Sequence, residues 1–306
     1  MKRTGELSTV RYIQKEKTLY LMLLPGIIFF IIYKYLPMLG LVIGFQDYNP
    51  SLGFISSRFA GLKHFRRFFT DMAFFRLFSN TMLISLYNLL FYFPLPIILA
   101  LMMNEVRKLW FKKFVQTITY LPHFVSWVVI FSMTYTIFTT EGGIINYYLG
   151  RYFGLNIPFL TSDKWFRSLI VLQNIWRECG WGTIIFLAAI TGIDPQLYEA
   201  AEIDGANRWK QTWYITLPCI RSTIIIMLLL RLGRMLDTGF EQIYLMLNAM
   251  NRNVGEVFDT YTYRIGIEQG QFSYSTVIGM FKSTVSLILV LLANWAAKKA
   301  GEEGIY

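Results

Sequence analysis

Long apolar runs, separated by shorter polar segments, dominate the pattern of this chain. Six runs each supply the ~20 residues that a helix needs to cross the hydrocarbon core of a bilayer. They cover residues 19–45, 81–103, 114–138, 168–190, 220–240 and 276–297. We therefore predict an all-α membrane protein with six transmembrane helices, folded as one transmembrane domain over residues 1–306.

The polar segments between the runs indicate which side of the membrane each one faces. With the N-terminus inside, the inner segments carry more Lys and Arg than the outer ones, as the positive-inside rule requires. We therefore expect both termini in the cytoplasm, with an N-terminal tail over residues 1–18 and a cytoplasmic loop over 191–219. On the outer side, Phe alternates with basic residues over 60–78, which predicts an amphipathic helix in the interface.

Composition supports a membrane location and removes one class of partner. Hydrophobic residues make up 55% of the chain and charged residues only 16%, whereas about 25% of residues are charged in soluble proteins. The formal net charge of +10 would suggest nucleic acid as the partner of a soluble protein. In so apolar a chain it fits Lys and Arg that face anionic membrane lipid, so no nucleic acid is expected.

The chain carries none of the motifs expected of an enzyme. It has no Gly-x-x-x-x-Gly-Lys-Ser/Thr loop, so ATP would have to be bound by another subunit. Cys179 and Cys219 are too few for a metal cluster and are expected to be free thiols. His123 follows a Leu-Pro pair, where a role at a helix start or in packing is favoured over catalysis or metal binding. We expect no catalytic residue, metal or cofactor in this chain.

The polar segment between the fourth and fifth runs is the most specific feature of the sequence. Asp194 and Pro195 are typical of a helix start, and Gly205 permits the backbone to leave the helix. Acidic residues lie where the positive end of the helix dipole favours them. Composition alone is equally compatible with an ordinary amphipathic cytoplasmic loop.

The spacing within this segment resembles the signature of permease subunits in binding-protein-dependent ABC importers. That signature reads Glu-Ala-Ala, three residues, Gly, nine residues, Ile, one residue, Leu-Pro. The chain matches it without a gap at Glu199, Ala200, Ala201, Gly205, Ile215, Leu217 and Pro218. Other stretches, including 120–127 and 239–244, resemble the maltose-permease-like sugar group, especially its branch for oligosaccharides of complex polysaccharides.

The resemblance implies a type I ABC importer permease fold in the bacterial inner membrane, with a cytoplasmic coupling helix seated in a separate ATPase subunit. The residues implied in ATPase coupling are Glu199, Ala200, Ala201, Asp204, Gly205, Ala206, Leu217 and Pro218. It also implies two ATPase subunits that hold ATP and Mg²⁺, an extracytoplasmic solute-binding protein, and a second permease that is a different chain.

Several charged residues fall within the apolar runs, where a charge at the bilayer centre costs about 2.5–3.5 kcal/mol. Arg231, Arg234 and Asp237 are three apart and are expected on one helix face. Such residues either form ion pairs within the membrane, as Arg177 and Glu178 could with another helix, or line a water-filled pathway. The sequence leaves both interpretations open.

Sugar sites combine planar polar groups with aromatic rings. On this basis, the candidate substrate-pathway residues are Trp127, Gln173, Asn174, Trp176, Arg177, Arg231, Arg234, Asp237, Tyr244 and Asn248. Arginine in such a lining favours carboxylates, which suggests acidic, uronate-containing oligosaccharides. Lipid phosphates explain the basic residues of the outer side equally well.

Import of oligosaccharides through an ABC permease is therefore the leading hypothesis. The nearest alternative is an ABC permease for a non-sugar solute. A membrane-embedded enzyme is more distant, because no pair of catalytic groups is evident. A channel or secondary transporter is disfavoured by the coupling signature and by the lack of a detectable inverted repeat.

Overall fold

The computed structural model describes residues 16–301 and residue 304, so most of the predicted tail over 1–18 lies outside the described residues. The helices are α2 (Lys17–Phe30), α3 (Gly53–Ser56), α4 (Lys63–Thr70), α5 (Ala73–Tyr87), α6 (Pro94–Glu105), α7 (Leu109–Tyr120), α8 (Trp127–Phe138), α9 (Ile144–Phe153), α10 (Asp163–Thr191), α11 (Pro195–Ile203), α12 (Arg208–Gln211), α13 (Leu217–Cys219), α14 (Arg221–Gly233), α15 (Phe240–Met246), α16 (Arg252–Gly255), α17 (Phe258–Tyr263) and α18 (Phe272–Lys299). Strands β1 (Gln46–Asp47) and β2 (Arg58–Phe59) pair as a small antiparallel hairpin.

Short π and 3₁₀ segments join several of these helices. A π turn (Ile31–Tyr35) and a 3₁₀ segment (Leu36–Phe45) prolong α2 into one long helical rod. Further π turns link α5 to α6 (Asn88–Tyr92), precede α13 (Thr212–Thr216) and follow α17 (Arg264–Glu268), while a 3₁₀ turn follows α7 (Leu121–Phe124).

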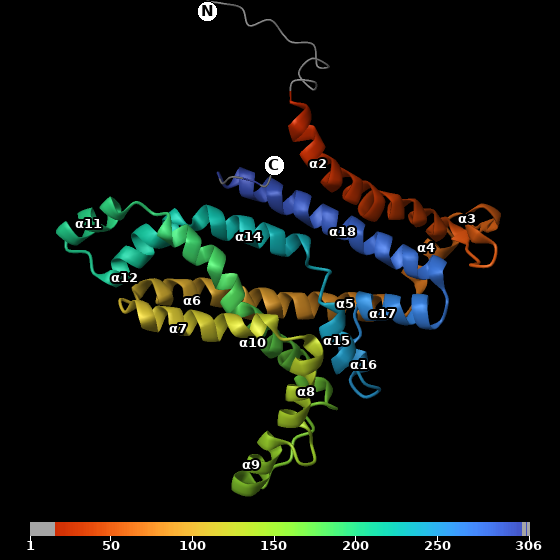
Figure 1. Cartoon of the computed structure of the whole chain (residues 1–306). Helices are drawn as coiled ribbons and strands as arrows, with labels where there is room; N and C mark the ends of the chain where they lie inside the picture. The colour runs from red at the N-terminus through yellow and green to blue at the C-terminus, as the bar shows by residue number, and fades with distance from the viewer. Residues whose placement is uncertain (1–15, 302–303, 305–306) are drawn as a thin grey trace, which may run out of the picture.

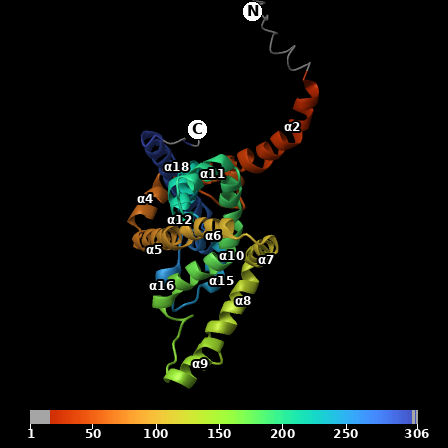
Figure 2. The ribbon, with the colours of Figure 1, turned by 90° about the vertical axis from the view of Figure 1, so that its left-hand side faces the viewer.

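The long helices form an elongated body, and a different set of short helices lies at each end of it. α10 packs against α5, α6 and α14, and α14 packs against α18. α11 and α12 lie at one end of this body, and α3 and α4 lie at the other (Figure 1). α2 leans away from the body (Figure 2), and none of its residues is buried, although the 3₁₀ segment after it packs against α18.

The core consists of three clusters of buried apolar side chains spaced along this body. Representative members are Phe68, Phe258 and Tyr274 in the first, Ile84, Ile170 and Ile243 in the second, and Ala100, Phe186 and Ile220 in the third. α10 contributes buried side chains to the second and third clusters. It is therefore the central helix of the fold.

Four of the predicted spans correspond to continuous helical segments. Lys17–Phe45, Ala73–Glu105 and Phe272–Lys299 are long and apolar enough to cross a membrane, and they contain the first, second and sixth predicted runs. α10 contains the fourth, although its polar residues make it less apolar than these three. The third and fifth runs differ from the prediction.

The third run, predicted as one helix over 114–138, bends by 100° between α7 and α8. Val125 is extended after the 3₁₀ turn, and extended Ser126 begins the next helix by accepting a hydrogen bond from the Val129 amide. Arg177 on α10 donates through Nε to the Val125 carbonyl at 3.1 Å. A side chain of the neighbouring helix thus satisfies a backbone group that the bend frees.

The fifth run, predicted over 220–240, ends as a helix at Gly233. The chain then leaves the helix and re-enters at α15 through Gly239, whose φ of 86° is in the left-handed region. Arg231, Arg234 and Asp237 therefore do not share one helix face, and that prediction is wrong. Residues 233–239 are mostly polar residues and glycine, so the break had a signal in the sequence that the predicted run passed over.

The predicted interfacial helix over 60–78 is also shorter than expected. α4 ends at Thr70, and residues 73–78 form the first turns of α5. Phe68 on α4 is buried against Tyr274 and Phe258 rather than facing lipid. The alternation of Phe with basic residues thus marks a helix that packs on the protein core.

Asp71 holds the junction between α4 and α5. Its carboxylate accepts hydrogen bonds from the Ala73 amide at 2.8 Å and from the hydroxyls of Tyr274 at 2.6 Å and Tyr261 at 3.2 Å. Burial raises the pKa of this carboxyl, but these bonds and the charge of Arg67 outweigh burial and hold the pKa below its usual value. An ionised Asp71 therefore ties this end of the body together.

The close packing of α7 on α10 gives a prediction about stability. A Cβ atom at Gly180 would collide with the carbonyl group of Thr119, so Gly180→Ala should destabilise the protein by about 1–3 kcal/mol. Gly279 on α18 is a matched control, because no atom lies within 4 Å of its Cβ position. Gly279→Ala should be neutral or stabilise by up to about 1 kcal/mol. Thermal unfolding of both variants in detergent checks this, and equal midpoints would contradict it.

Candidate functional site

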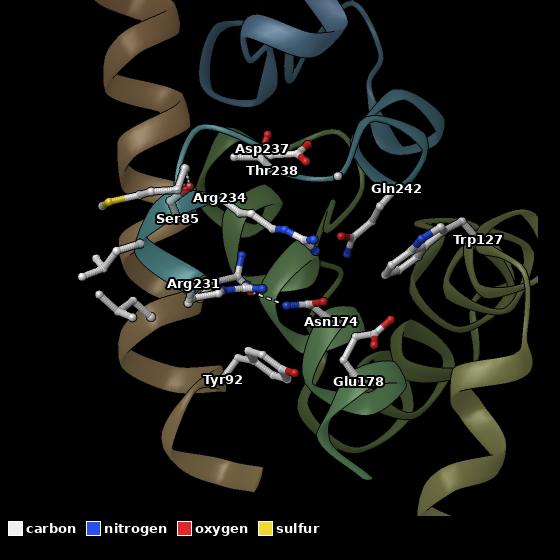
Figure 3. Close-up of a pocket in the computed structure, with 15 residues that line it drawn as sticks. Ser85, Tyr92, Trp127, Asn174, Glu178, Arg231, Arg234, Asp237, Thr238 and Gln242 are labelled. Atoms are coloured by element: carbon white, nitrogen blue, oxygen red, sulfur yellow. Dashed lines mark hydrogen bonds between the residues drawn. The ribbon is translucent and has the colours of Figure 1, made fainter. Parts of the chain in front are cut away.

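A polar cavity of about 260 Å³ lies where α5, the π turn Asn88–Tyr92, α8, α10, α14 and α15 meet. Its polar and aromatic lining consists of Ser85, Asn88, Tyr92, Trp127, Asn174, Glu178, Arg231, Arg234, Asp237, Thr238 and Gln242 (Figure 3). We call it the central cavity. The π turn after α5 and the irregular stretch after α14 bring backbone breaks to its wall, as is typical of membrane proteins where a cavity is lined.

Two arginines form the basic side of the central cavity. The guanidinium of Arg231 lies over the ring of Tyr92, 5.1 Å from its centroid. Arg234 follows directly after α14 and points into the cavity (Figure 3). Among residues 16–301 and 304, neither arginine has a carboxylate within ion-pair distance, and Asp237 forms no ion pair with them. The two guanidinium groups therefore form no ion pair with either carboxylate of the cavity lining, Glu178 or Asp237.

The carboxylate on the opposite wall is already bound by the protein. Glu178 accepts from Arg177, its neighbour on α10, and lies 3.0 Å from Nδ1 of His123. His123 stacks on Trp181 with centroids 4.3 Å apart and planes 3° from parallel, while Arg177 lies over Trp127 at 4.6 Å. This network confirms a packing role for His123. It also leaves Glu178 little capacity to repel an anion.

Amide groups complete the wall between the two sides. Asn174 donates to Asn88 at 2.6 Å, and Gln242 donates to Gln173 at 3.0 Å. The hydroxyl of Thr238 is buried in this wall and has no hydrogen-bond partner among the described residues. Such a group is available to a ligand, because buried polar atoms are normally hydrogen-bonded. The cavity thus combines unpaired donors, amides and aromatic rings.

Half of the predicted pathway residues line the central cavity. These are Trp127, Asn174, Arg231, Arg234 and Asp237, whereas Gln173, Trp176, Arg177, Tyr244 and Asn248 do not line it. Arg177 and Gln173 do not line the cavity but contact residues that do: Arg177 forms an ion pair with Glu178, and Gln173 accepts a hydrogen bond from Gln242. Trp176 is 43% exposed on α10. Tyr244 and Asn248 lie beyond the cavity on α15 and the loop that follows it.

The prediction missed the contribution of the second span. Ser85, Asn88 and Tyr92 all line the central cavity from α5 and the π turn. They are three and four residues apart, which places them on one helix face. That polar stripe on an apolar run was a readable signal in the sequence.

The segment from Glu199 to Pro218 forms a second candidate site, at one end of the helical body. Asp194 caps α11 by accepting from the Gln196 amide at 3.0 Å. The Ala206 amide closes the helix by donating to the Ala201 carbonyl at 2.8 Å, and Gly205 has a φ of 75°. This is the C-terminal geometry that favours glycine. Its signature glycine therefore has a conformational reason.

Two side-chain contacts attach this segment to the body. Arg208 forms an ion pair with Glu105 at the end of α6, and the hydroxyls of Tyr198 and Thr216 lie 2.9 Å apart. α11 has no buried residue, and Ile203 is 87% exposed. An exposed helix with a fixed base is suited to docking into another protein.

The eight predicted coupling residues fall into two groups in the structure. Glu199, Ala200, Ala201, Asp204, Gly205 and Ala206 belong to α11 and the turn that closes it. Leu217 and Pro218 instead form α13, where Leu217 packs against the core cluster near α10. The first group offers a surface, and the second group anchors that surface to the helical body.

Comparison with known proteins gives a family match over most of the chain. Residues 93–301 match the family described as binding-protein-dependent transport system inner membrane component. The polygalacturonan/rhamnogalacturonan transport system permease protein YteP of Bacillus subtilis (strain 168) is 57% identical over 292 residues, covering 95% of this chain and 91% of that protein.

Two solved structures have the same fold. One is the crystal structure of a bacterial alginate ABC transporter in complex with an alginate pentasaccharide-bound periplasmic protein, with a TM-score of 0.89 and 40% identity over 97% of this chain and 99% of that one. The other is a bacterial ABC transporter involved in the import of the acidic polysaccharide alginate, with a TM-score of 0.87 and 40% identity over 94% and 98%. These matches confirm the fold predicted from the sequence.

Proposed function

The chain belongs to the family of binding-protein-dependent transport system inner membrane components, and we propose that its cargo is an oligosaccharide that carries carboxylate groups. As a member of this family it is a permease subunit of an ABC importer. The observation that carries the proposal is the pair Arg231 and Arg234 in the central cavity, with no ion-pairing carboxylate among the described residues.

The chemistry of the central cavity supports an acidic sugar over a neutral one. A guanidinium group binds a carboxylate through two parallel hydrogen bonds. Trp127 and Tyr92 supply ring faces for the apolar side of a sugar, and Asn174 and Thr238 supply groups for its hydroxyls. The names of similar proteins are consistent with an acidic cargo. One relative is named for polygalacturonan and rhamnogalacturonan, and two solved structures are of alginate transporters, one of which is described as importing an acidic polysaccharide.

The partners follow from what this chain lacks and from its exposed segment. We infer that α11 is the coupling helix and seats in an ATPase subunit, with ATP and Mg²⁺ bound there. Two ATPase subunits, a second and different permease chain and an extracytoplasmic binding protein would complete the importer. Among the described residues, no group of three or more His, Cys, Asp or Glu side chains could hold a metal ion.

This assembly also sets the proposed topology. The α11 end of the body is cytoplasmic, and the α4 end faces outward to the binding protein. α18 runs from the α4 end toward the α11 end (Figure 1), so the C-terminus is on the cytoplasmic side. The N-terminus is proposed on the same side, from the distribution of Lys and Arg. Closure of the ATPase subunits would move α11 and open the central cavity alternately to each side.

Coupling is tested by charge changes on α11. Gly205→Asp and Glu199→Lys should abolish transport-coupled ATP hydrolysis in the reconstituted importer, because both alter the proposed contact surface. Gly142→Asp and Glu141→Lys are matched controls, since Gly142 has the same φ of 75° and open surroundings but lies between α8 and α9. All four variants should insert in the membrane. Normal coupling in the α11 variants would rule out the docking assignment.

Cargo charge is tested in the central cavity. Arg231→Ala and Arg234→Ala should each lower uptake of acidic oligosaccharides about ten- to a hundredfold, the effect of losing a hydrogen bond to a charged group. Uptake of neutral oligosaccharides should change much less, and Arg234→Lys should retain part of the preference. Arg151→Ala, an exposed arginine on α9, is the control for general surface charge. Equal losses on both substrates, or none, would exclude the acidic cargo.

A further inference from the structure

A cluster of three aromatic rings lies next to the central cavity. The rings of Phe240 and Tyr244 on α15 are nearly parallel, with centroids 5.1 Å apart and planes at 23°. Tyr263 at the end of α17 is 5.1 Å from Phe240 and 5.2 Å from Tyr244. We call these three residues the aromatic platform.

The aromatic platform remains accessible although one face of its helix is buried. Gln242 and Ile243 are 4% and 0% exposed, whereas Phe240 and Tyr244 are 36% and 42% exposed. The two exposed residues are four apart, so they share the face of α15 opposite its buried face. Aromatic rings bury large apolar areas when they pack in a core, so their exposure as a group indicates a surface that binds something.

Polar groups surround the aromatic platform on one side. A second cavity of about 350 Å³ is lined by Tyr244 together with Arg252, Thr260, Arg264 and others. The one deeply buried carboxylate there, Glu256, is 2% exposed and is neutralised by Arg264 at 2.8 Å and by Arg76 at 3.2 Å. Arg252 is exposed and forms no ion pair within the described part of the chain.

The two cavities are joined by one short helix. Gly239 and Gln242 line the central cavity and Tyr244 lines the second one. α15 has seven residues and is therefore about 10 Å long. An extended chain of sugar rings can span that length, whereas a single small solute cannot occupy both cavities. The helices that carry much of the lining of the second cavity, α15 to α17, lie toward the end of the body away from α11 (Figure 1).

We propose that the aromatic platform, with Arg252 beside it, is a second sugar subsite that binds a ring of the oligosaccharide outside the central cavity. This rests on the proposed function. The mixture of stacked rings with a free guanidinium and a hydroxyl is suited to a sugar, which has an apolar face and a polar edge. A lipid chain or an apolar subunit contact would leave the exposed guanidinium group of Arg252 without a partner of matching polarity.

The subsite predicts that the permease distinguishes cargo by length. The complete importer, in vesicles with its binding protein, would be given oligogalacturonates of two to six residues. The double variant Tyr244→Ala with Tyr263→Ala should lower uptake of the longer oligomers about three- to tenfold, the effect of losing one ring contact. Uptake of the dimer, which the central cavity can hold alone, should stay within about twofold of the unmodified importer.

Two variants separate ring stacking from other effects. Tyr244→Phe keeps the ring and removes only the hydroxyl that lies 3.4 Å from Glu268, so it should retain the length preference. Tyr148→Ala with Tyr152→Ala removes another exposed stacked pair, on α9, whose rings are 6.3 Å apart at 6°. This control should transport all lengths normally.

Each other result decides against the subsite. Equal uptake by the double variant and the control at every length would overturn it. An equal loss of uptake at every length would also overturn it. Such a loss would indicate a gate if the second permease still co-purifies with the double variant, and a contact with the second permease if it does not. The single variant Tyr244→Leu repeats the comparison if the double variant assembles poorly. Failure of the unmodified importer to take up any oligogalacturonate would instead contradict the proposed function.

Discussion

The ionic network around Glu178 determines how the helices meet at the centre of this protein. Arg177 and His123 both contact the Glu178 carboxylate, and Arg177 also donates to the carbonyl of Val125. The network therefore stabilises the 100° bend between α7 and α8 and places Trp127 on the cavity wall. Without a partner, a carboxylate at this depth would cost several kcal/mol. The same contacts compensate Glu178, one of the two carboxylates that line the central cavity; the other, Asp237, forms no ion pair with the two cavity arginines.

The central cavity and the exposed helix α11 are connected by rigid elements. α10 contributes Asn174 and Glu178 to the cavity and continues as a helix to Thr191, three residues before the cap of α11. α6 provides a second connection, through the ion pair of Glu105 with Arg208. Because packed helices move as units rather than deforming, a displacement of α11 would be carried to the cavity wall.

The sequence predicted the parts of this fold that follow from continuous apolar length and fixed spacing. The continuous helical segments Ala73–Glu105 and Phe272–Lys299 contain two of the predicted spans, and the spacing from Glu199 to Gly205 corresponds to a capped helix that ends at a left-handed glycine. The bend at Val125 and the helix end at Gly233 were not predicted, because hydropathy does not report backbone direction. For the same reason, Arg234 was expected on a helix face, whereas it lies just after the end of α14. The π turn that presents Asn88 and Tyr92 was missed because it leaves the hydrophobic pattern unbroken.

Charge is distributed differently at the centre and at the α4 end of the body, and the difference bears on function. Near α4 and α17, charges are closely paired: Glu256 contacts Arg76 and Arg264, and Asp47 contacts Lys63. The buried Glu256 carboxylate is thereby neutralised within the protein. In the central cavity, the partly exposed Arg231 and the exposed Arg234 have no such carboxylate within ion-pair distance among the described residues. An anionic group bound in the cavity would gain stronger contacts with these guanidinium groups than it makes in bulk solution. Two guanidinium groups without a carboxylate partner are thus the feature on which the proposed preference for an acidic cargo depends.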